Sequence, residues 1–157
     1  MTIITAEQVE NACLKIAQRI KARTPEACTL AAVSRGGLAP TAIVAHYLGV
    51  KDILFIRLSS YADQSRQQSQ ISDTTTDNIP NLPNTYIIDD ICDSGETVTY
   101  LRKKYPKAQI YTLVNKNSAI KPDYFPLAEE QGVWVNFPWE PEDRVSSFDV
   151  NPENMPE

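Results

Sequence analysis

The stretch Thr85-Tyr-Ile-Ile-Asp-Asp-Ile-Cys-Asp-Ser-Gly-Glu-Thr97 decides the fold of this chain. It opens with an apolar, partly β-branched run that is typical of a strand buried on both faces of a parallel sheet. The run ends at Asp89 and Asp90, and a short polar turn then leads into a helical pattern that includes Val98. A strand, an acidic pair, a hydroxyl-rich turn and a helix are parts from which α/β proteins build anion sites.

The residue types in this stretch predict a ligand that carries both a phosphate and neutral hydroxyls. The backbone N–H groups of the turn and the hydroxyls of Ser94 and Thr97 suit a phosphate. Carboxylates repel phosphates, so Asp89 and Asp90 beside the turn indicate neutral hydroxyls, such as those of a ribose phosphate, and a metal ion that offsets the charge. An ordinary strand-to-helix turn with an N-capping Asp or Ser would explain the turn but not the acidic pair.

The composition limits the class of protein. At 157 residues, 42% hydrophobic and 22% charged, the chain suits one soluble domain with a substantial core. A net charge of −5 without a basic stripe argues against nucleic-acid binding. We expect no integral membrane segment and no signal peptide. The three cysteines are far apart and form no zinc or disulfide motif, so we expect reduced thiols in the cytoplasm.

Helical and strand patterns alternate along the chain. A capping box at Thr5-Ala-Glu-Gln8 predicts a helix that stops before Pro25. The polar segment 62–84 predicts a connection without regular structure. The order predicts an α/β fold, a doubly wound and mostly parallel sheet with flanking helices. The other predicted elements are strand 28–33, helix 38–48, strand 52–58, a helix that ends near 104 and strand 107–114.

Three further segments carry candidate binding residues. Ser34-Arg-Gly-Gly37 follows a predicted strand, where Arg35 supplies a fixed cation and the glycines let the backbone approach a ligand. A plain glycine turn is the alternative. Lys116 follows strand 107–114, at the sheet edge where ligand loops gather, although most lysines are merely solvated. Trp134 alternates with two valines as in a short strand and can stack on a planar base.

Residues 88–97 resemble the phosphoribosyl-pyrophosphate signature of the type I phosphoribosyltransferases, with Glu96 where a glycine is usual. The loop Ser34–Gly37 and the pattern Trp-Val-X-X-Pro-Trp-Glu that ends at Glu140 are most similar to the bacterial xanthine-guanine enzymes. The resemblance implies one phosphoribosyltransferase domain over 1–148, followed by a poorly ordered acidic tail at 149–157. Within the domain it implies a flexible hood loop at 62–84 and a purine-recognition segment at 132–140.

The resemblance also implies an activity in purine salvage. The enzyme would transfer the 5-phosphoribosyl group from phosphoribosyl pyrophosphate to a 6-oxopurine, which is guanine, xanthine or hypoxanthine, and release pyrophosphate. It implies that Asp93 is the general base, that Lys116 donates to the purine O6, and that Trp134 and the Val135 backbone contact the base. The residues implied for phosphoribosyl pyrophosphate are Arg35, Gly36, Gly37, Arg66, Asp89, Asp90, Asp93, Ser94, Gly95, Glu96 and Thr97.

The resemblance implies Mg²⁺ as the cofactor, held by Asp89, Asp90 and Glu140, with Glu140 where Asp is usual. It also implies a homodimer or homotetramer in the cytoplasm. Two alternatives stay open: a transferase for another base, and a non-catalytic regulatory protein of the same fold. Lys116 and Trp134 favour a 6-oxopurine, because a lysine donor suits O6 and would meet an amino group poorly.

Overall fold

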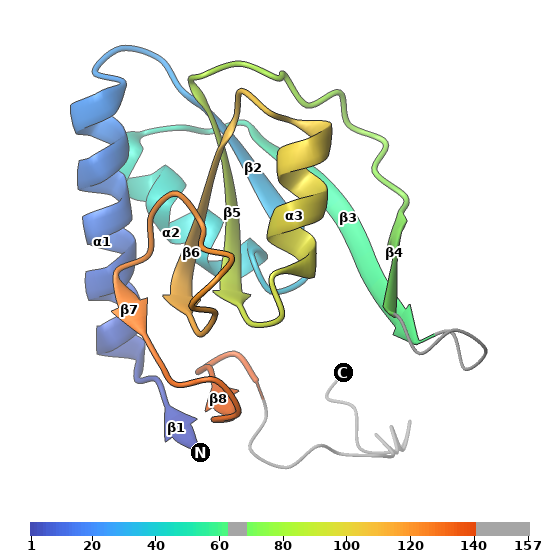
Figure 1. The fold of residues 1–157 in the computed structure, drawn as a ribbon. Coiled ribbons are helices and arrows are strands. Elements are labelled where there is room, and N and C mark those ends of the chain that lie inside the picture. The colour runs from blue at the N-terminus through green and yellow to red at the C-terminus, as the bar shows by residue number, and fades with distance from the viewer. Residues whose placement is uncertain (63–68, 141–157) are drawn as a thin grey trace, which may run out of the picture.

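A computed structural model of the protein describes residues 1–62 and 69–140. The alternation expected from the sequence is confirmed as an α/β fold with a mostly parallel sheet (Figure 1). The elements are β1 (Thr2–Ile3), α1 (Ala6–Arg23), β2 (Thr29–Ser34), α2 (Leu38–Leu48), β3 (Ile53–Ala62), β4 (Ser69–Asp73), β5 (Thr85–Cys92), α3 (Glu96–Lys104), β6 (Gln109–Asn115), β7 (Leu127–Ala128) and β8 (Val135–Asn136).

The main sheet has the strand order β4-β3-β2-β5-β6-β7. Only the β3–β4 pair is antiparallel among these neighbours. From β2 the chain continues to β3 on one side and later returns to β5 on the other side of β2. The strand order therefore reverses between β2 and β5, and such a reversal opens a crevice outside the carboxyl ends of the two strands.

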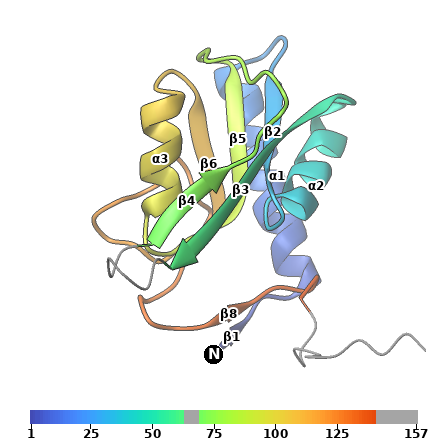
Figure 2. The same ribbon diagram turned by 90° about the vertical axis from the view of Figure 1, so that its right-hand side faces the viewer.

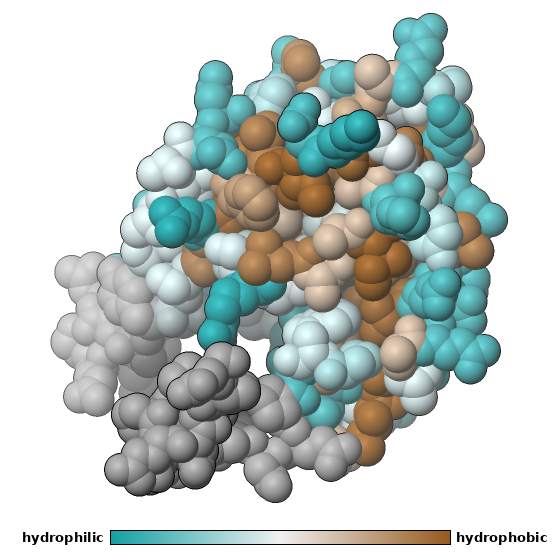
Figure 3. Space-filling view, turned by 180° about the vertical axis from the view of Figure 1, so that it is seen from behind, coloured by the Kyte–Doolittle hydropathy of each residue, from teal (hydrophilic) through white to brown (hydrophobic). Residues whose placement is uncertain are grey.

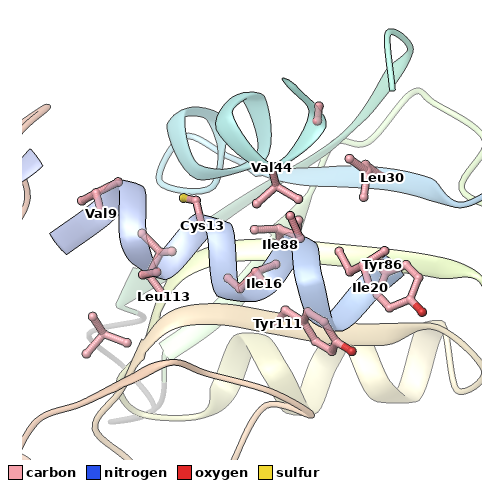
Figure 4. Packing of buried hydrophobic residues seen from close by; sticks show 14 of the residues in the cluster. Val9, Cys13, Ile16, Ile20, Leu30, Val44, Tyr86, Ile88, Tyr111 and Leu113 are labelled. Atoms are coloured by element: carbon pink, nitrogen blue, oxygen red, sulfur yellow. The ribbon is translucent and has the colours of Figure 1, made fainter. Parts of the chain in front are cut away.

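Helices cover both faces of this sheet, with α1 and α2 on one face and α3 on the other (Figures 1 and 2). Alternate residues of β5 serve the two sides: Tyr86 and Ile88 pack with the α1 cluster, and Ile87 packs with the α3 cluster. Ile16 and Ile20 of α1 are fully buried in the first cluster (Figure 4). Burial of an isoleucine of this kind stabilises the fold by about 1.5–3 kcal/mol.

The predicted capping box of α1 is confirmed. The Gln8 N–H donates to the Thr5 hydroxyl at 3.1 Å, and the Thr5 N–H donates to the Gln8 side chain at 2.8 Å. The thiols of Cys13, Cys28 and Cys92 are all free, as expected from their spacing. Within residues 1–62 and 69–140, no helix combines the length and the apolar character needed to cross a bilayer. Figure 3 shows hydrophilic and hydrophobic residues mixed over the rear surface.

A small parallel sheet of β1 and β8 lies beyond the carboxyl ends of the main strands (Figures 1 and 2). The Thr2 N–H donates to the Trp134 carbonyl at 2.8 Å, and the Ile4 N–H donates to the Asn136 carbonyl at 3.0 Å. The first residues of the chain therefore hold the segment for which purine recognition was predicted.

The expectation that segment 62–84 lacks regular structure is wrong for residues 69–73, which form β4. β3 also runs to Ala62, beyond the predicted end at residue 58. Polar side chains that follow β4 stabilise the edge of β3. Asp77 accepts from the Phe55 N–H, and Thr75 accepts from the Arg57 N–H. Arg66 and the tail 149–157 lie outside the described residues.

Asp73, the last residue of β4, joins the β3–β4 ribbon to α3. Its carboxylate accepts from the Tyr100 hydroxyl at 2.6 Å, from the Lys104 ammonium at 2.5 Å and from the Thr75 N–H at 2.9 Å. Burial by itself would raise the pKa of Asp73, but the bonds from Lys104, Thr75 and Tyr100 outweigh it and hold this pKa below its usual range. The ribbon is therefore anchored to the helix that begins beside the polar turn.

Candidate active site

The acidic pair lies in β5 rather than after it, because this strand continues to Cys92. The Asp90 N–H donates to Asp89 Oδ1 at 2.9 Å, and the Ile91 N–H donates to Asp90 Oδ1 at 2.8 Å. Burial raises the pKa of Asp89 well above its usual value, and the neighbouring charge of Asp90 adds to this. Burial likewise raises the pKa of Asp90. Two partly buried carboxyls side by side are well suited to bind a cation or sugar hydroxyls.

The loop after β2 packs directly on this acidic pair. A side-chain carbon at Gly36 would lie 2.3 Å from Asp90 Oδ2, so any residue larger than glycine would require the Asp90 carboxylate to move. The Ser34–Arg35 peptide bond is cis, and the Arg35 side chain is exposed. The Gly37 N–H donates to the Val33 carbonyl at 2.7 Å. This differs from the expectation that both glycine amides serve a ligand, because the Gly37 amide already has a partner within the loop.

The polar turn between β5 and α3 needs its glycine for two reasons. Gly95 has φ +84°, a left-handed conformation that side chains disfavour, and an added carbon would lie 2.8 Å from Ile120. The Ser94 hydroxyl accepts from the Glu96 N–H at 3.3 Å. The turn and the first residues of α3 together present backbone N–H groups at the positive end of the helix dipole, as an anion site requires.

A cavity of about 140 Å³ brings these elements together. It contains residues from β2, β3, β4, β5 and α3, namely Val33, Ser34, Leu58, Ser59, Ser60, Ile71, Asp89 and Thr97. Larger cavities of about 460 and 580 Å³ have mainly apolar linings and lie beside α3 and between α1 and α2. We assign the candidate site to the cavity of about 140 Å³, because Asp89 of the acidic pair lines it together with residues of the glycine loop and of α3. Ser94 and Glu96 line the 460 Å³ cavity instead.

Lys116 reaches Asp93 across the end of the sheet, with 3.1 Å between its Nζ and Asp93 Oδ2. The Lys116 side chain is only 6% exposed, whereas the Asp93 side chain is 58% exposed. Lysines are almost never buried without a specific partner, so this burial argues against a merely solvated lysine. The structure thus brings together the residues predicted as purine donor and general base.

Asn117 belongs to this site, although no sequence pattern singles it out. Its Nδ2 donates to the carbonyls of Asp93 at 3.1 Å and Ser94 at 3.0 Å. Its Oδ1 accepts from the N–H groups of Ala119 at 2.9 Å and Ile120 at 2.8 Å. An asparagine after a strand is ordinary loop composition, so no sequence signal distinguishes it.

The segment after β7 supplies a different set of contacts. Trp134 precedes β8 and is 54% exposed. Trp139 instead stacks on the buried Phe137, with ring centroids 4.7 Å apart and an angle of 7° between the planes. The Glu140 carboxylate accepts from the Phe137 N–H at 3.1 Å, and its charge contributes to the raised pKa of Asp90.

The donor set at the acidic pair fits Mg²⁺. Among residues 1–62 and 69–140, no group of three or more His, Cys, Asp or Glu side chains is arranged to hold a metal by itself. Mg²⁺ commonly takes one or two carboxylates and completes its shell with water and substrate phosphates. Asp89 and Asp90 provide such carboxylates, and a cation would relieve the repulsion between them.

Comparisons with known proteins agree with this geometry. The phosphoribosyl transferase domain family matches residues 2–145. A xanthine-guanine phosphoribosyltransferase of Ruegeria sp. (strain TM1040) is 34% identical over 116 residues, which span 69% of this chain and 66% of the relative. The enzyme of the same name from Vibrio atlanticus (strain LGP32) is 32% identical over 140 residues, 88% of each chain.

A solved purine phosphoribosyltransferase from Pyrococcus horikoshii has the same fold, with a TM-score of 0.74, 24% identity and coverage of 93% of this chain and 98% of that one. The site geometry agrees with the family match, because the acidic pair, the polar turn and the glycine loop all lie at the crevice between β2 and β5. This chain belongs to the phosphoribosyl transferase domain family.

Proposed function

We propose that this protein is a purine-salvage enzyme that transfers the 5-phosphoribosyl group from phosphoribosyl pyrophosphate to a 6-oxopurine. The bond between C1 of the ribose and the pyrophosphate oxygen breaks, and a bond from C1 to a purine nitrogen forms. The observation that carries the proposal is the buried Lys116 beside Asp93, next to a phosphate turn and an acidic pair. The names of the relatives from Ruegeria and Vibrio support the same activity.

The ribose phosphate binds at the β5–α3 junction in this proposal. Amides of the turn 93–97 and the hydroxyls of Ser94 and Thr97 hold the 5′-phosphate. Asp89 and Asp90 accept hydrogen bonds from the ribose hydroxyls. Arg35 and the Gly36 amide stabilise the pyrophosphate as it leaves, which is where negative charge develops. When bound, Mg²⁺ supplies positive charge to the pyrophosphate oxygens.

The purine binds between Lys116 and Trp134. The Lys116 ammonium donates to O6, which requires it to turn from Asp93 toward the base. Trp134 covers one face of the ring, and the Val135 backbone contacts its edge. Asp93 accepts the proton that the purine loses as the new bond forms, and pyrophosphate is released.

The discriminating experiment is a set of initial rates with guanine, xanthine, hypoxanthine and adenine, each with phosphoribosyl pyrophosphate and Mg²⁺. We expect turnover with at least one 6-oxopurine and little with adenine, because a lysine donor meets the adenine amino group poorly. Efficient use of adenine or of a pyrimidine would refute the assigned base class. Absence of pyrophosphate release with every base would favour a non-catalytic regulatory protein.

We also propose Mg²⁺ dependence, a cytoplasmic location and self-association. A chelator should abolish turnover, and added Mg²⁺ should restore it. Leu38 and Phe55 are 39% and 44% exposed and line one cavity together, and these neighbouring apolar side chains support a contact between subunits. Sedimentation equilibrium should give a dimer or tetramer, and a monomer at assay concentrations would contradict the proposal.

A further inference from the structure

The Asn117 side chain uses its full hydrogen-bonding capacity inside the protein. A primary amide has two N–H donors and an oxygen that accepts two bonds. All four positions are filled by backbone groups of Asp93, Ser94, Ala119 and Ile120 at 2.8–3.1 Å. Asn117 is 8% exposed, so water cannot readily replace these partners.

Two of these bonds fix the direction of the phosphate turn. A peptide unit is planar and trans, so its C=O and N–H point in opposite directions. Because Asn117 holds the Asp93 carbonyl, the Ser94 N–H of the same unit points to the other side. The bond to the Ser94 carbonyl does the same for the Gly95 N–H. With Gly95 in the left-handed conformation, successive amides of this kind form a concave anion site.

The position of Asn117 is itself fixed at the end of β6. Asn115 is 6% exposed, and its Nδ2 donates to the Asn117 carbonyl at 2.8 Å. The Asn117 N–H donates back to Asn115 Oδ1 at 3.2 Å. The Ile120 N–H, which Asn117 holds, belongs to the residue that packs against Gly95. The loop after β6 therefore contacts the turn in two ways: Asn117 binds its carbonyls, and Ile120 packs against Gly95.

We propose that Asn117 is a positioning residue that directs the Ser94 and Gly95 amides toward the 5′-phosphate. The inference rests on the proposed function, since it assigns that phosphate to the turn. Asn117 does not touch the substrate in this account. It acts through the backbone orientation of the turn. Because the neighbouring Lys116 binds the base, one short loop contributes to binding both the phosphate and the purine.

The informative variant is Asn117→Asp, which keeps the shape and the acceptor for Ala119 and Ile120. It replaces both donors by an oxygen that faces the carbonyls of Asp93 and Ser94. The matched control is Asn84→Asp, which makes the same charge change at the opposite end of β5, where Asn84 donates to the Ala27 carbonyl at 3.2 Å. Asn117→Ser is a milder variant for the case in which Asn117→Asp does not fold.

The measurements are calorimetric titrations with ribose 5-phosphate and, separately, with Mg²⁺ pyrophosphate, plus thermal unfolding. We expect the Asn117 variants to bind ribose 5-phosphate at least tenfold more weakly and pyrophosphate within twofold of wild type. Asn84→Asp should match wild type for both ligands. Folded Asn117 variants that bind ribose 5-phosphate normally, or that lose both ligands equally, would overturn the inference. If wild type itself binds no ribose 5-phosphate, the proposed function fails instead.

Discussion

Replacing Lys116 by Met separates the catalytic role of the lysine from its role in stability. Met keeps much of the length of the side chain and removes its charge. The Asp93 carboxylate is 58% exposed, so water can solvate it once Lys116 is gone. Loss of the ion pair therefore costs about 1 kcal/mol at most, and removal of the burial penalty of the Lys116 ammonium offsets part of that.

The effect of Lys116→Met on catalysis should be much larger. Lys116 is 6% exposed, so its hydrogen bond to the purine O6 forms in a site with little competing water. A charged donor of this kind contributes about 2–4 kcal/mol to the transition state. Since about 1.4 kcal/mol corresponds to a factor of ten, kcat/KM should fall about 30- to 1000-fold. The free energy of unfolding, measured in urea, should change by about 1 kcal/mol or less.

Lys104→Met is the matched control, because Lys104 also pairs with an aspartate, at 2.5 Å from Asp73. The Asp73 side chain is only 12% exposed, so loss of its cation should reduce stability by about 1 kcal/mol or more. Turnover should stay within twofold of wild type. A Lys116→Met enzyme with normal kcat/KM, or one in which stability and activity fall together as in a partly unfolded protein, would refute the reasoning.

Three further substitutions test other parts of the site. Asp93→Asn should reduce kcat by at least a hundredfold and change the affinity for phosphoribosyl pyrophosphate little, and equal losses in both would contradict its role as base. Gly36→Ala should abolish turnover while the far-ultraviolet circular dichroism stays unchanged, because the added carbon would lie 2.3 Å from Asp90 Oδ2; a fully active variant would show that the loop does not need this close contact. The pKa of Asp73 is lowered from the ordinary 3.8, so its ionised form stabilises the fold above about pH 4 and this contribution is lost at lower pH. The difference in unfolding free energy between wild type and Asp73→Asn should shrink from pH 6 to pH 3, and a constant difference would show that the charge of Asp73 is not involved.

The features predicted correctly are those in which local chemistry and global packing agree. The capping box and the apolar run of β5 each have a local physical requirement, and each is found where the pattern indicates. The mostly parallel character of the sheet follows from the alternation of strands and helices along the chain. The assignment of a role to each site residue remains a prediction that the experiments above address.

The features that the sequence did not reveal depend on distant partners. β4 ends in Asp73, a residue type with low strand propensity, and it forms because β3 offers an unpaired edge. The burial of Lys116 follows from the course of the loop after β6, which composition does not specify. Asn117 acquires its importance from two carbonyls more than twenty residues earlier in the chain.

The pairing of β1 with β8 has a practical consequence for handling the protein. Residues 2–4 hold the backbone on both sides of Val135 and precede the capped start of α1. An affinity tag fused to Met1 would lie beside Trp134 and could compete with Thr2 for its carbonyl. Kinetic work on base selectivity should therefore use protein without a tag at Met1, so that differences among purines report on the enzyme and not on the tag.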